Sequence, residues 1–208
     1  MTSRGFVAIS TRVDILEEYE ERRDALDHRW TEFFDACDIV PILVPNDPAV
    51  ARKIVLRARP QGIVLSGGND LVKLGGNAPE RDSTERTLLE FALSHKVPIL
   101  GVCRGAQFII DSFGGALRPV RNHVRNNHFI EFEGHKILVN SFHRFGASEL
   151  PEELVVSARS EDGIVEAFAH GTKKVAGIMW HPERVHPFSY HDILWFKDFF
   201  GVVKDEES

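Results

Sequence analysis

The chain has 208 residues, 43% of them hydrophobic and 27% charged, which is typical of a soluble protein with one sizeable α/β domain spanning residues 1–208. The net charge of −6 argues against general nucleic-acid binding, and two cysteines are too few for a disulfide framework. The sequence has no apolar signal segment at its start and no run of about 20 apolar residues, so we expect a cytoplasmic protein with no membrane partner.

The first quarter of the chain predicts strand, helix, strand. Phe6–Ser10 and Ile39–Val44 are short apolar runs typical of buried strands. The charged run Glu17–Arg23 is interpreted as a solvated helix face or as the lead-in to a helix. An amphipathic helix is predicted from apolar residues at helical spacing, which place the first cysteine in the core. These residues are Leu26, Trp30, Phe33, Phe34 and Cys37.

Helix-start signals define the next two helices. Asp47 and Pro48 are typical of an N-cap and first helical position, and the helix is expected to run to about Ala58. Asp82 and Glu85 resemble a capping box for a helix over residues 83–94.

Between these helices, Gly62–Leu65 is predicted to be a buried strand that ends in the turn Ser66-Gly67-Gly68-Asn69-Asp70. Two glycines directly after a strand let the backbone approach a ligand closely, although a simple tight turn would use them too. The polar segment Leu71–Arg81 is expected to be a loop long enough to lie over a site.

The stretch from Val97 to Gly115 carries the strongest functional signal. An apolar run, Val97–Val102, leads into the sharp turn Gly101-Val102-Cys103-Arg104-Gly105, and a helix over residues 106–113 follows. Strand, tight turn with a nucleophile, and helix is the nucleophile-elbow pattern, with Cys in place of Ser. The flanking glycines are needed because a side chain there would collide with the neighbouring strand or helix.

Cys103 is therefore predicted to be the nucleophile rather than a buried structural cysteine. At a helix N-terminus, unpaired N–H groups and the helix dipole favour the thiolate, which is the reactive form. The backbone N–H of Arg104 is well placed to bind an oxyanion forming on a carbonyl that Cys103 attacks.

Alternating strands and helices in the first half predict a mostly parallel sheet covered on both faces by helices. Ligands of such sheets bind beyond the carboxyl ends of the strands, where Arg12, residues 66–70 and Cys103 all fall. The second half is richer in short β-type runs, so we expect partly antiparallel strands there, with a closing helix over Asp192–Val202. These runs are Leu117–Val120, Lys136–Phe142, Leu154–Ala158, Ile164–Phe168 and Val175–Trp180.

The run Val175–Trp180 is followed directly by His181-Pro182-Glu183. In an extended segment, residues i and i+2 point the same way, so His181 and Glu183 can face the site together. We interpret them as a base and the carboxylate that orients it, completing the catalytic set Cys103, His181 and Glu183. A surface histidine after a strand is the alternative for His181 alone.

No metal and no cofactor are predicted. His123, His128, His135 and His143 are scattered along the sequence without paired cysteines or a metal-binding spacing. The segment Arg121–His128 is expected to be a polar loop, which could help to bind an anionic substrate.

The elbow 101–107, the turn 66–70 and Trp180-His181-Pro182-Glu183 together resemble the class I glutamine amidotransferase superfamily over nearly the whole chain. The resemblance implies a flavodoxin-like α/β domain and a γ-glutamyl thioester on Cys103. It implies backbone oxyanion donors at Gly68 and Arg104. It also implies that Gln107 contacts the glutamyl group and that the backbone around Arg144 and Phe145 holds its amino-acid end. Gly67, His143 and Arg12 are further candidate substrate contacts.

Further motifs resemble the γ-glutamyl hydrolase (peptidase C26) branch: Cys103-Arg104-Gly105, Arg81-Asp82 with Glu85, residues 139–143, and Asp162-Gly163 with Glu166. That branch usually continues the Asn-Ser-x-His segment with His-Gln, whereas this chain has Arg144-Phe145. The substrate beyond the γ-glutamyl group can therefore differ from a simple polyamine or folate conjugate.

Narrower features resemble the γ-glutamyl-CDP-amidate hydrolases of capsule phosphoramidate synthesis. They are Thr11-Arg12, residues 23–27 with Trp30, residues 75–77 before Arg81-Asp82, and residues 179–184. A nucleotide diphosphate leaving group favours guanidinium partners, and ordinary salt bridges are the alternative for each candidate. The candidates are Arg12, Arg104, Arg144 and Arg184.

The predicted function is hydrolysis of a γ-glutamyl amide, with release of L-glutamate from a small-molecule substrate. Two alternatives stay open. One is a glutaminase subunit that supplies ammonia to a separate synthase partner. The other is a non-enzymatic ligand-binding relative, which the intact Cys103, His181 and Glu183 argue against.

Overall fold

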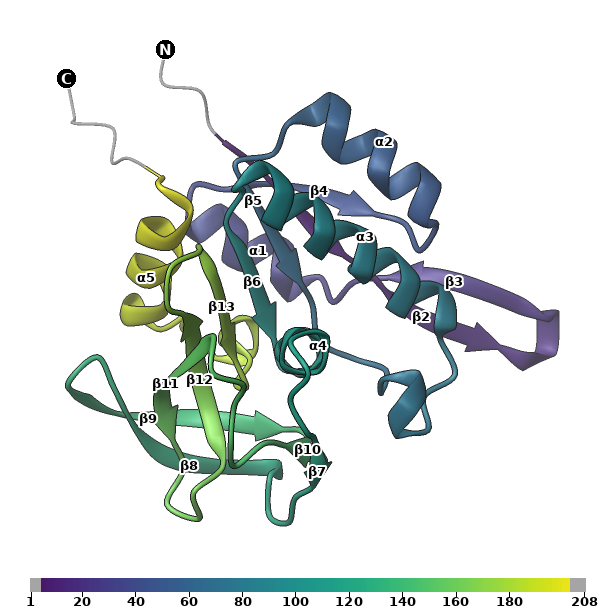
Figure 1. The fold of residues 1–208 in the computed structure, drawn as a ribbon. Coiled ribbons are helices and arrows are strands. Elements are labelled where there is room, and N and C mark those ends of the chain that lie inside the picture. Colours follow the sequence, from purple (N-terminus) through teal and green to yellow (C-terminus); the bar gives the residue numbers. More distant parts are fainter. Residues whose placement is uncertain (1–4, 203–208) are drawn as a thin grey trace, which may run out of the picture.

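The computed structural model describes residues 5–202 and is built around a seven-stranded sheet (Figure 1). Five strands are parallel, and the two at one edge run antiparallel to their neighbours. In spatial order the strands are β11 (Leu154–Arg159), β12 (Val165–His170), β13 (Val175–Ile178), β6 (Ile99–Val102), β5 (Gly62–Leu65), β1 (Phe6–Ser10) and β4 (Val40–Val44).

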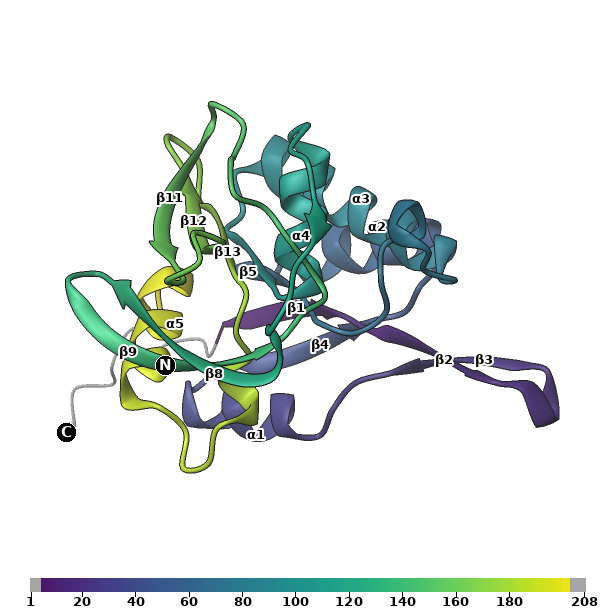
Figure 2. The ribbon, with the colours of Figure 1, turned by 90° about the horizontal axis from the view of Figure 1, so that it is seen from below.

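Helices cover both faces of this sheet (Figures 1 and 2). One face carries α1 (Arg29–Ala36) and α5 (Tyr190–Phe200), and their aromatic side chains pack on it. The other carries α2 (Pro48–Ala58), α3 (Pro79–His95) and α4 (Arg104–Ser112). The predicted α/β class, with a mostly parallel sheet and antiparallel strands added in the second half, is confirmed.

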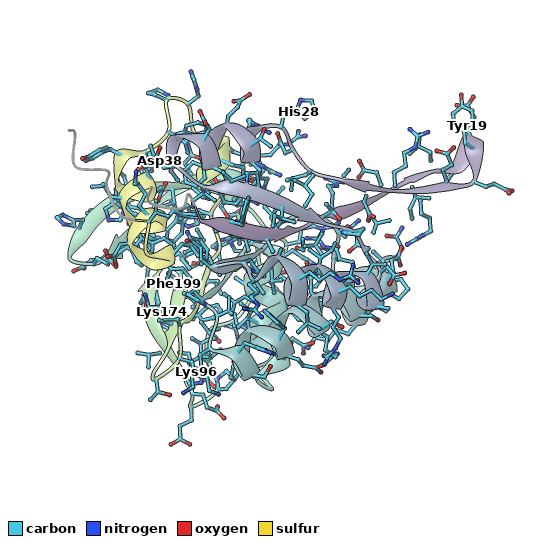
Figure 3. The ribbon with its side chains drawn as sticks, turned by 90° about the horizontal axis from the view of Figure 1, so that it is seen from above. Tyr19, His28, Asp38, Lys96, Lys174 and Phe199 are labelled. Atoms are coloured by element: carbon cyan, nitrogen blue, oxygen red, sulfur yellow. The ribbon has the colours of Figure 1, made fainter. Side chains whose placement is uncertain are left out.

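Three two-stranded ribbons lie outside the main sheet. The ribbon β2–β3 (Arg12–Leu16 and Glu21–Ala25) projects from the body, with Tyr19 at its tip (Figure 3). The ribbon β8–β9 (Val124–Phe132 and His135–Phe142) runs across the lower end of the main strands in Figure 1. The third ribbon is β7–β10 (Arg118–Pro119 and Phe145–Gly146). Short 3₁₀ turns occupy Glu17–Tyr19, Val72–Leu74 and Pro182–Arg184.

Two predictions missed these ribbons. Glu17–Arg23, interpreted as a helix face or lead-in, belongs to the β2–β3 ribbon instead. All of β3 is exposed or half-buried, so no alternation of apolar and polar residues marks it as a strand. Arg121–His128 is not a loop throughout, since Val124 onward pairs with β9.

Two predicted helix starts were also wrong. α1 begins at Arg29, so Leu26 lies before it, although Trp30, Phe33, Phe34 and Cys37 are buried as expected. α3 begins at Pro79, inside the segment predicted as a loop, and Asp82 and Glu85 do not cap it. A proline at the first helical position was the signal for this earlier start.

None of the helices within residues 5–202 combines the length and the apolar character needed to cross a membrane.

Candidate active site

Cys103 sits at the turn between β6 and α4, with φ 51° and ψ −104°. A residue other than glycine seldom adopts positive φ, so the backbone is strained at this residue. Its N–H donates to Ile178 O of the neighbouring strand at 2.8 Å, which anchors the turn to the sheet. The nucleophile-elbow geometry predicted for Cys103 is present.

The two glycines around the elbow allow this close packing. A Cβ on Gly105 would lie 2.0 Å from the carbonyl oxygen of Leu65, and one on Gly101 would lie 2.4 Å from the backbone of Gly105. Both distances are far inside van der Waals contact, so a side chain at either position would push the turn out of place.

His181 follows β13 and lies beside Cys103 with its ring buried. Its Nδ1 is 2.7 Å from Glu183 Oε1, and Glu183 is buried as well. Asn140 holds the backbone of His181 twice, because Nδ2 donates to His181 O and Oδ1 accepts from His181 N–H, each at 2.8 Å. The predicted convergence of His181 and Glu183 on the elbow is therefore observed.

The electrostatics at His181 favour its charged form. Burial by itself lowers the pKa of His181, but the charge of Glu183, and after it the charge and hydrogen bond of Cys103, raise that pKa to about 9. At neutral pH the imidazole is therefore mainly protonated, between the Glu183 carboxylate and the Cys103 sulfur.

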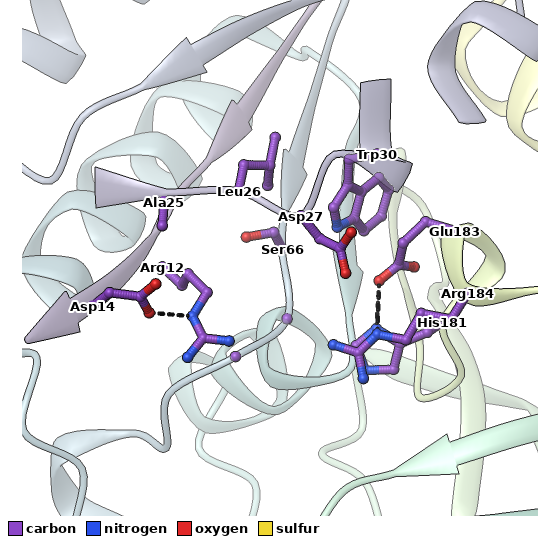
Figure 4. A pocket seen from close by; sticks show the side chains of 12 residues that line it. Arg12, Asp14, Ala25, Leu26, Asp27, Trp30, Ser66, His181, Glu183 and Arg184 are labelled. Atoms are coloured by element: carbon purple, nitrogen blue, oxygen red, sulfur yellow. Dashed lines mark hydrogen bonds and ion pairs between the residues drawn. The ribbon is translucent and has the colours of Figure 1, made fainter. Parts of the chain in front are cut away.

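A cavity of about 220 Å³ opens beside these residues (Figure 4). Its wall combines the turn at Gly67 and Gly68 with His181 and Glu183. Figure 4 shows the contact between the His181 and Glu183 side chains. Asp27 contributes a negative charge, since its hydrogen bond from Arg29 lowers the pKa of Asp27 to about 2. The remaining lining residues are Arg12, Asp14, Ala25, Leu26, Trp30, Ser66 and Arg184.

Arg81 is fully buried on α3 and binds the backbone of the turn after β5. Its guanidinium donates to the carbonyl oxygens of Ser66, Gly67 and Gly68 at 2.6, 3.0 and 2.8 Å. Burial lowers the pKa of Arg81 to about 9, which leaves it charged at neutral pH. With its carbonyls tied to Arg81, the turn keeps one orientation beside the cavity.

Residues 143–145, which the family resemblance assigns to the glutamyl group, are hydrogen-bonded to α4. Gln107 Nε2 donates to Phe145 O at 2.8 Å, and His143 Nδ1 lies 3.1 Å from the same oxygen. Since a carbonyl only accepts, His143 carries its proton on Nδ1. His143 is buried, whereas the exposed Arg144 side chain forms an ion pair with Asp70.

The four candidate phosphate-binding arginines have different surroundings. Arg12 and Arg184 line the cavity: Arg12 Nε lies 2.7 Å from Asp14, and the Arg184 guanidinium lies 4.7 Å from the centre of the Phe142 ring. The Arg104 side chain is buried in ion pairs with Asp82 and Glu85, so it points away from the cavity, and only its backbone N–H stays a candidate.

The histidines that are scattered in the sequence are partly assembled in the fold. His123, His128 and His143 converge on Glu166, while His135 lies on the outer part of β9 near His191. Treating all four as unrelated was wrong, because the β8–β9 ribbon folds back beside β12.

Sequence reasoning missed several residues of the site. Arg81 appeared only as part of a family motif, and its role needs the contact between α3 and the turn after β5. Asp27 and Trp30 were named within a family motif, and Trp30 also as a core residue of a helix, but not as cavity residues. They reach the cavity because β3 brings the chain back to it. Asn140 appeared only within a family motif, and its role needs the contact between β9 and the backbone of His181.

The fold and the site define an α/β protein with a cysteine at a nucleophile elbow, next to a paired histidine and carboxylate. Comparison with known families identifies the family. Residues 23–200 match the family model of glutamine amidotransferase class-I, so the chain belongs to this family. A solved glutamine amidotransferase from Thermotoga maritima shares the fold, with a TM-score of 0.69, 19% identity, and coverage of 94% of this chain and 83% of the other.

Among named relatives, a gamma-glutamyl-CDP-amidate hydrolase of Campylobacter jejuni subsp. jejuni serotype O:2 is 33% identical over 96% of this chain and 100% of the relative. The glutamine-hydrolyzing GMP synthase subunit of Methanopyrus kandleri is 34% identical over 75% of this chain and 82% of the relative.

Proposed function

We propose that this protein is a stand-alone hydrolase that cleaves a γ-glutamyl amide bond and releases L-glutamate. The observation that carries the proposal is the buried sequence of contacts from Cys103 to His181 to Glu183 at the edge of an open cavity. Three groups in this order can activate a thiol, hold the resulting charge and return the proton to a leaving group.

In the proposed reaction, the Cys103 thiolate attacks the γ-carbonyl carbon and forms the C–S bond. The oxyanion accepts hydrogen bonds from the N–H groups of Gly68 and Arg104. The His181 imidazolium gives its proton to the departing nitrogen as the C–N bond breaks. His181 then takes a proton from water, which attacks the thioester and frees glutamate and the Cys103 sulfur.

The proposed substrate is γ-glutamyl-CDP-amidate. Its hydrolysis would be a step of phosphoramidate synthesis for a capsule or surface polysaccharide. Support comes from the Campylobacter relative, which aligns over its whole length. It also comes from Arg12 and Arg184, two guanidinium groups on the cavity wall where a diphosphate leaving group would lie. Gly67, Gln107 and the segment 143–145 are proposed to hold the glutamyl end.

The first test is glutamate release by the purified protein alone. L-glutamine, a γ-glutamyl amine and γ-glutamyl-CDP-amidate are offered side by side, with Cys103→Ala as the inactive variant and Cys37→Ala as its matched cysteine control. We expect γ-glutamyl-CDP-amidate to have the highest kcat/KM and Cys103→Ala to have no turnover. Activity retained by Cys103→Ala would disprove the mechanism.

A second test separates the diphosphate contacts from the chemistry. Arg12→Gln should raise KM for γ-glutamyl-CDP-amidate roughly tenfold, because a hydrogen bond to a charged group contributes about 1.5–3 kcal/mol. Arg184 does not serve in this test, since its Nε lies 3.6 Å from Glu183 Oε1. KM for a γ-glutamyl amine should not change. Arg52→Gln, an exposed substitution on α2, is the control and should affect neither substrate.

The second candidate function is a glutaminase that supplies ammonia to a separate synthase. It is favoured by the relatives named as glutamine-hydrolyzing GMP synthase subunits. Turnover of glutamine alone, or no activity until a partner protein is added, would support this function over the hydrolase.

A further inference from the structure

A second group of titratable side chains is buried outside the catalytic cavity. His123 precedes β8, His143 follows β9, and Glu166 lies on β12; their exposed fractions are 3%, 2% and 0%. His128 on β8 joins them with a side chain that is 15% exposed. None of these side chains takes part in the bond-forming or bond-breaking steps of the proposed reaction.

Three atoms of this cluster form a nearly regular triangle. His123 Nδ1 and His143 Nε2 are 3.2 Å apart, and they lie 3.2 and 3.4 Å from Glu166 Oε1. Four ligands at the usual zinc distance of about 2.0–2.1 Å occupy a tetrahedron whose edges are about 3.3 Å. The triangle therefore has the size of one face of a tetrahedral metal site.

The outer contacts of the two histidines turn their lone pairs toward this triangle. His143 Nδ1 faces the carbonyl oxygen of Phe145, so its proton is there and Nε2 is free to accept. His123 Nε2 lies 3.1 Å from the Asp162 carboxylate and donates to it, so the neutral ring presents its Nδ1 lone pair to the triangle. Metal-binding histidines are typically oriented by such a carbonyl or carboxylate on the other nitrogen.

Glu166 lacks the partners that a buried carboxylate needs. Both of its oxygens are buried, and neither receives a well-directed hydrogen bond, although histidine nitrogens surround Oε1. Two nitrogen lone pairs and a carboxylate that face one another repel unless a proton or a metal cation lies between them, and a single metal ion can bind all three atoms at once. His128 Nε2, also without a hydrogen-bond partner, lies 3.4 Å from the same Oε1 and is the nearest candidate for a fourth ligand.

We propose that His123, His143 and Glu166, with His128 as the fourth ligand, bind a single Zn²⁺ ion. Imidazole and carboxylate donors suit zinc, and the burial of all three primary ligands is typical of a structural site. The ion would join the β8–β9 ribbon to β12. Through the bond from His143 to Phe145, it would also support the segment that contacts Gln107 on α4.

The test is zinc binding by the full-length protein. The chelator-stripped chain is incubated with Zn²⁺, dialysed and analysed for metal content and by X-ray absorption. We expect about one zinc per chain and a first shell of nitrogen and oxygen only, at about 2.0–2.1 Å. Cys103→Ala should bind zinc like the wild type, which excludes a site formed by the catalytic cysteine.

Matched variants test which residues hold the ion. Glu166→Gln keeps the side-chain shape and should weaken zinc binding more than about 100-fold, beyond the 10–100-fold that an outer partner contributes. Asp162→Asn, half-exposed and so safe for folding, should weaken it about 10–100-fold. His135→Gln on the same ribbon should not change it.

Two outcomes would overturn the proposal. One is a wild-type chain that retains less than about a tenth of an equivalent of zinc after dialysis. Structural zinc is normally bound tightly and would not be lost in this way. The other is a sulfur ligand near 2.3 Å together with loss of zinc in Cys103→Ala. In either case the histidines and Glu166 would be held together by hydrogen bonds from protonated imidazole. The proposed hydrolase activity does not depend on the zinc site and would still stand.

Discussion

Among single side chains, Glu183 should matter most after Cys103 and His181. Its carboxylate accepts from His181 Nδ1, which leaves Nε2 for the sulfur and stabilises the imidazolium. We predict that Glu183→Gln lowers kcat/KM roughly 10³- to 10⁴-fold, as loss of the equivalent carboxylate does in other catalytic sets. Glu152→Gln, an exposed substitution, is the control. A loss below about tenfold would mean that Glu183 does not orient His181.

The charge on His181 predicts how stability depends on pH. Its pKa rises from an ordinary value of 6.5 to about 9 on folding, so the folded state binds this proton more tightly than the unfolded state. The stabilisation is complete below pH 6.5 and is lost as pH rises through 9, and it amounts to about 3 kcal/mol or less. Urea unfolding of wild type and His181→Gln between pH 6 and 10 measures it. Parallel curves for the two proteins would contradict the assignment.

The two cysteines should differ sharply in reactivity. Burial raises the pKa of Cys37 to about 12, so its thiol stays protonated at neutral pH, whereas Cys103 lies beside a charged His181 that borders the cavity. We predict that iodoacetamide at pH 7.5 modifies Cys103 at least about tenfold faster than Cys37 in the folded protein. Peptide mass spectrometry reads each site separately, and the urea-unfolded chain, in which the two rates should converge, is the control. Equal rates in the folded protein would contradict the prediction.

At the scale of elements, α3 is coupled to the turn after β5 through Arg81. We predict that Arg81→Lys lowers kcat about 10- to 100-fold, because an ammonium cannot bind the carbonyls of Ser66, Gly67 and Gly68 together and the Gly68 N–H loses its orientation. Stability should also fall, by about 1–3 kcal/mol for each buried carbonyl left without its hydrogen bond. Arg86→Lys, exposed on the same helix, is the control. Unchanged kcat in a folded Arg81→Lys protein would mean that Arg81 does not couple α3 to the orientation of this turn.

Sequence patterns predicted the elements whose own residues carry the signal. The buried strands β5 and β6 are apolar throughout, and β1 is apolar up to Ser10. Helix α2 has an N-cap whose side chain accepts from Val50 N–H as expected. The β2–β3 ribbon lacks such a signal, because β3 is stabilised by backbone pairing with β2 rather than by burial. For β8, the alternation of His128, Ile130 and Phe132 was available, but the polar residues before it concealed the strand.

The residues of the candidate site also fall into those that a local sequence motif predicts and those that it does not. Cys103, His181 and Glu183 stand within short motifs whose geometry is local, so their convergence followed from two strand ends at one edge of the sheet. Arg81 and Glu166 act through contacts between segments far apart in the sequence. Nothing local to α3 or β12 indicates those contacts, since a buried charged residue becomes evident only when its partners are placed.

For the molecule as a whole, the sheet joins two apolar layers that need each other. α1 and α5 come from opposite ends of the chain and meet on one face, where the rings of Phe33 and Phe196 lie 4.8 Å apart at 89°. The elbow strand β6 contributes side chains to both layers, Ile99 to one and Leu100 and Val102 to the other. We propose that residues 5–202 therefore unfold as one cooperative unit.

This coupling gives a prediction for Phe196→Ala. The substitution empties a fully buried position between α1 and α5 and should lower the free energy of unfolding by about 3–5 kcal/mol, or the melting temperature by roughly 6–20 °C. Tyr19→Ala, at the 60% exposed tip of the β2–β3 ribbon, should change it by less than about 0.5 kcal/mol. Far-ultraviolet dichroism and tryptophan fluorescence should report coincident transitions for both variants. Separate transitions in Phe196→Ala would mean that the helical layer of α1 and α5 can melt while the elbow strand stays folded, and that Cys103 does not depend on this layer for its position.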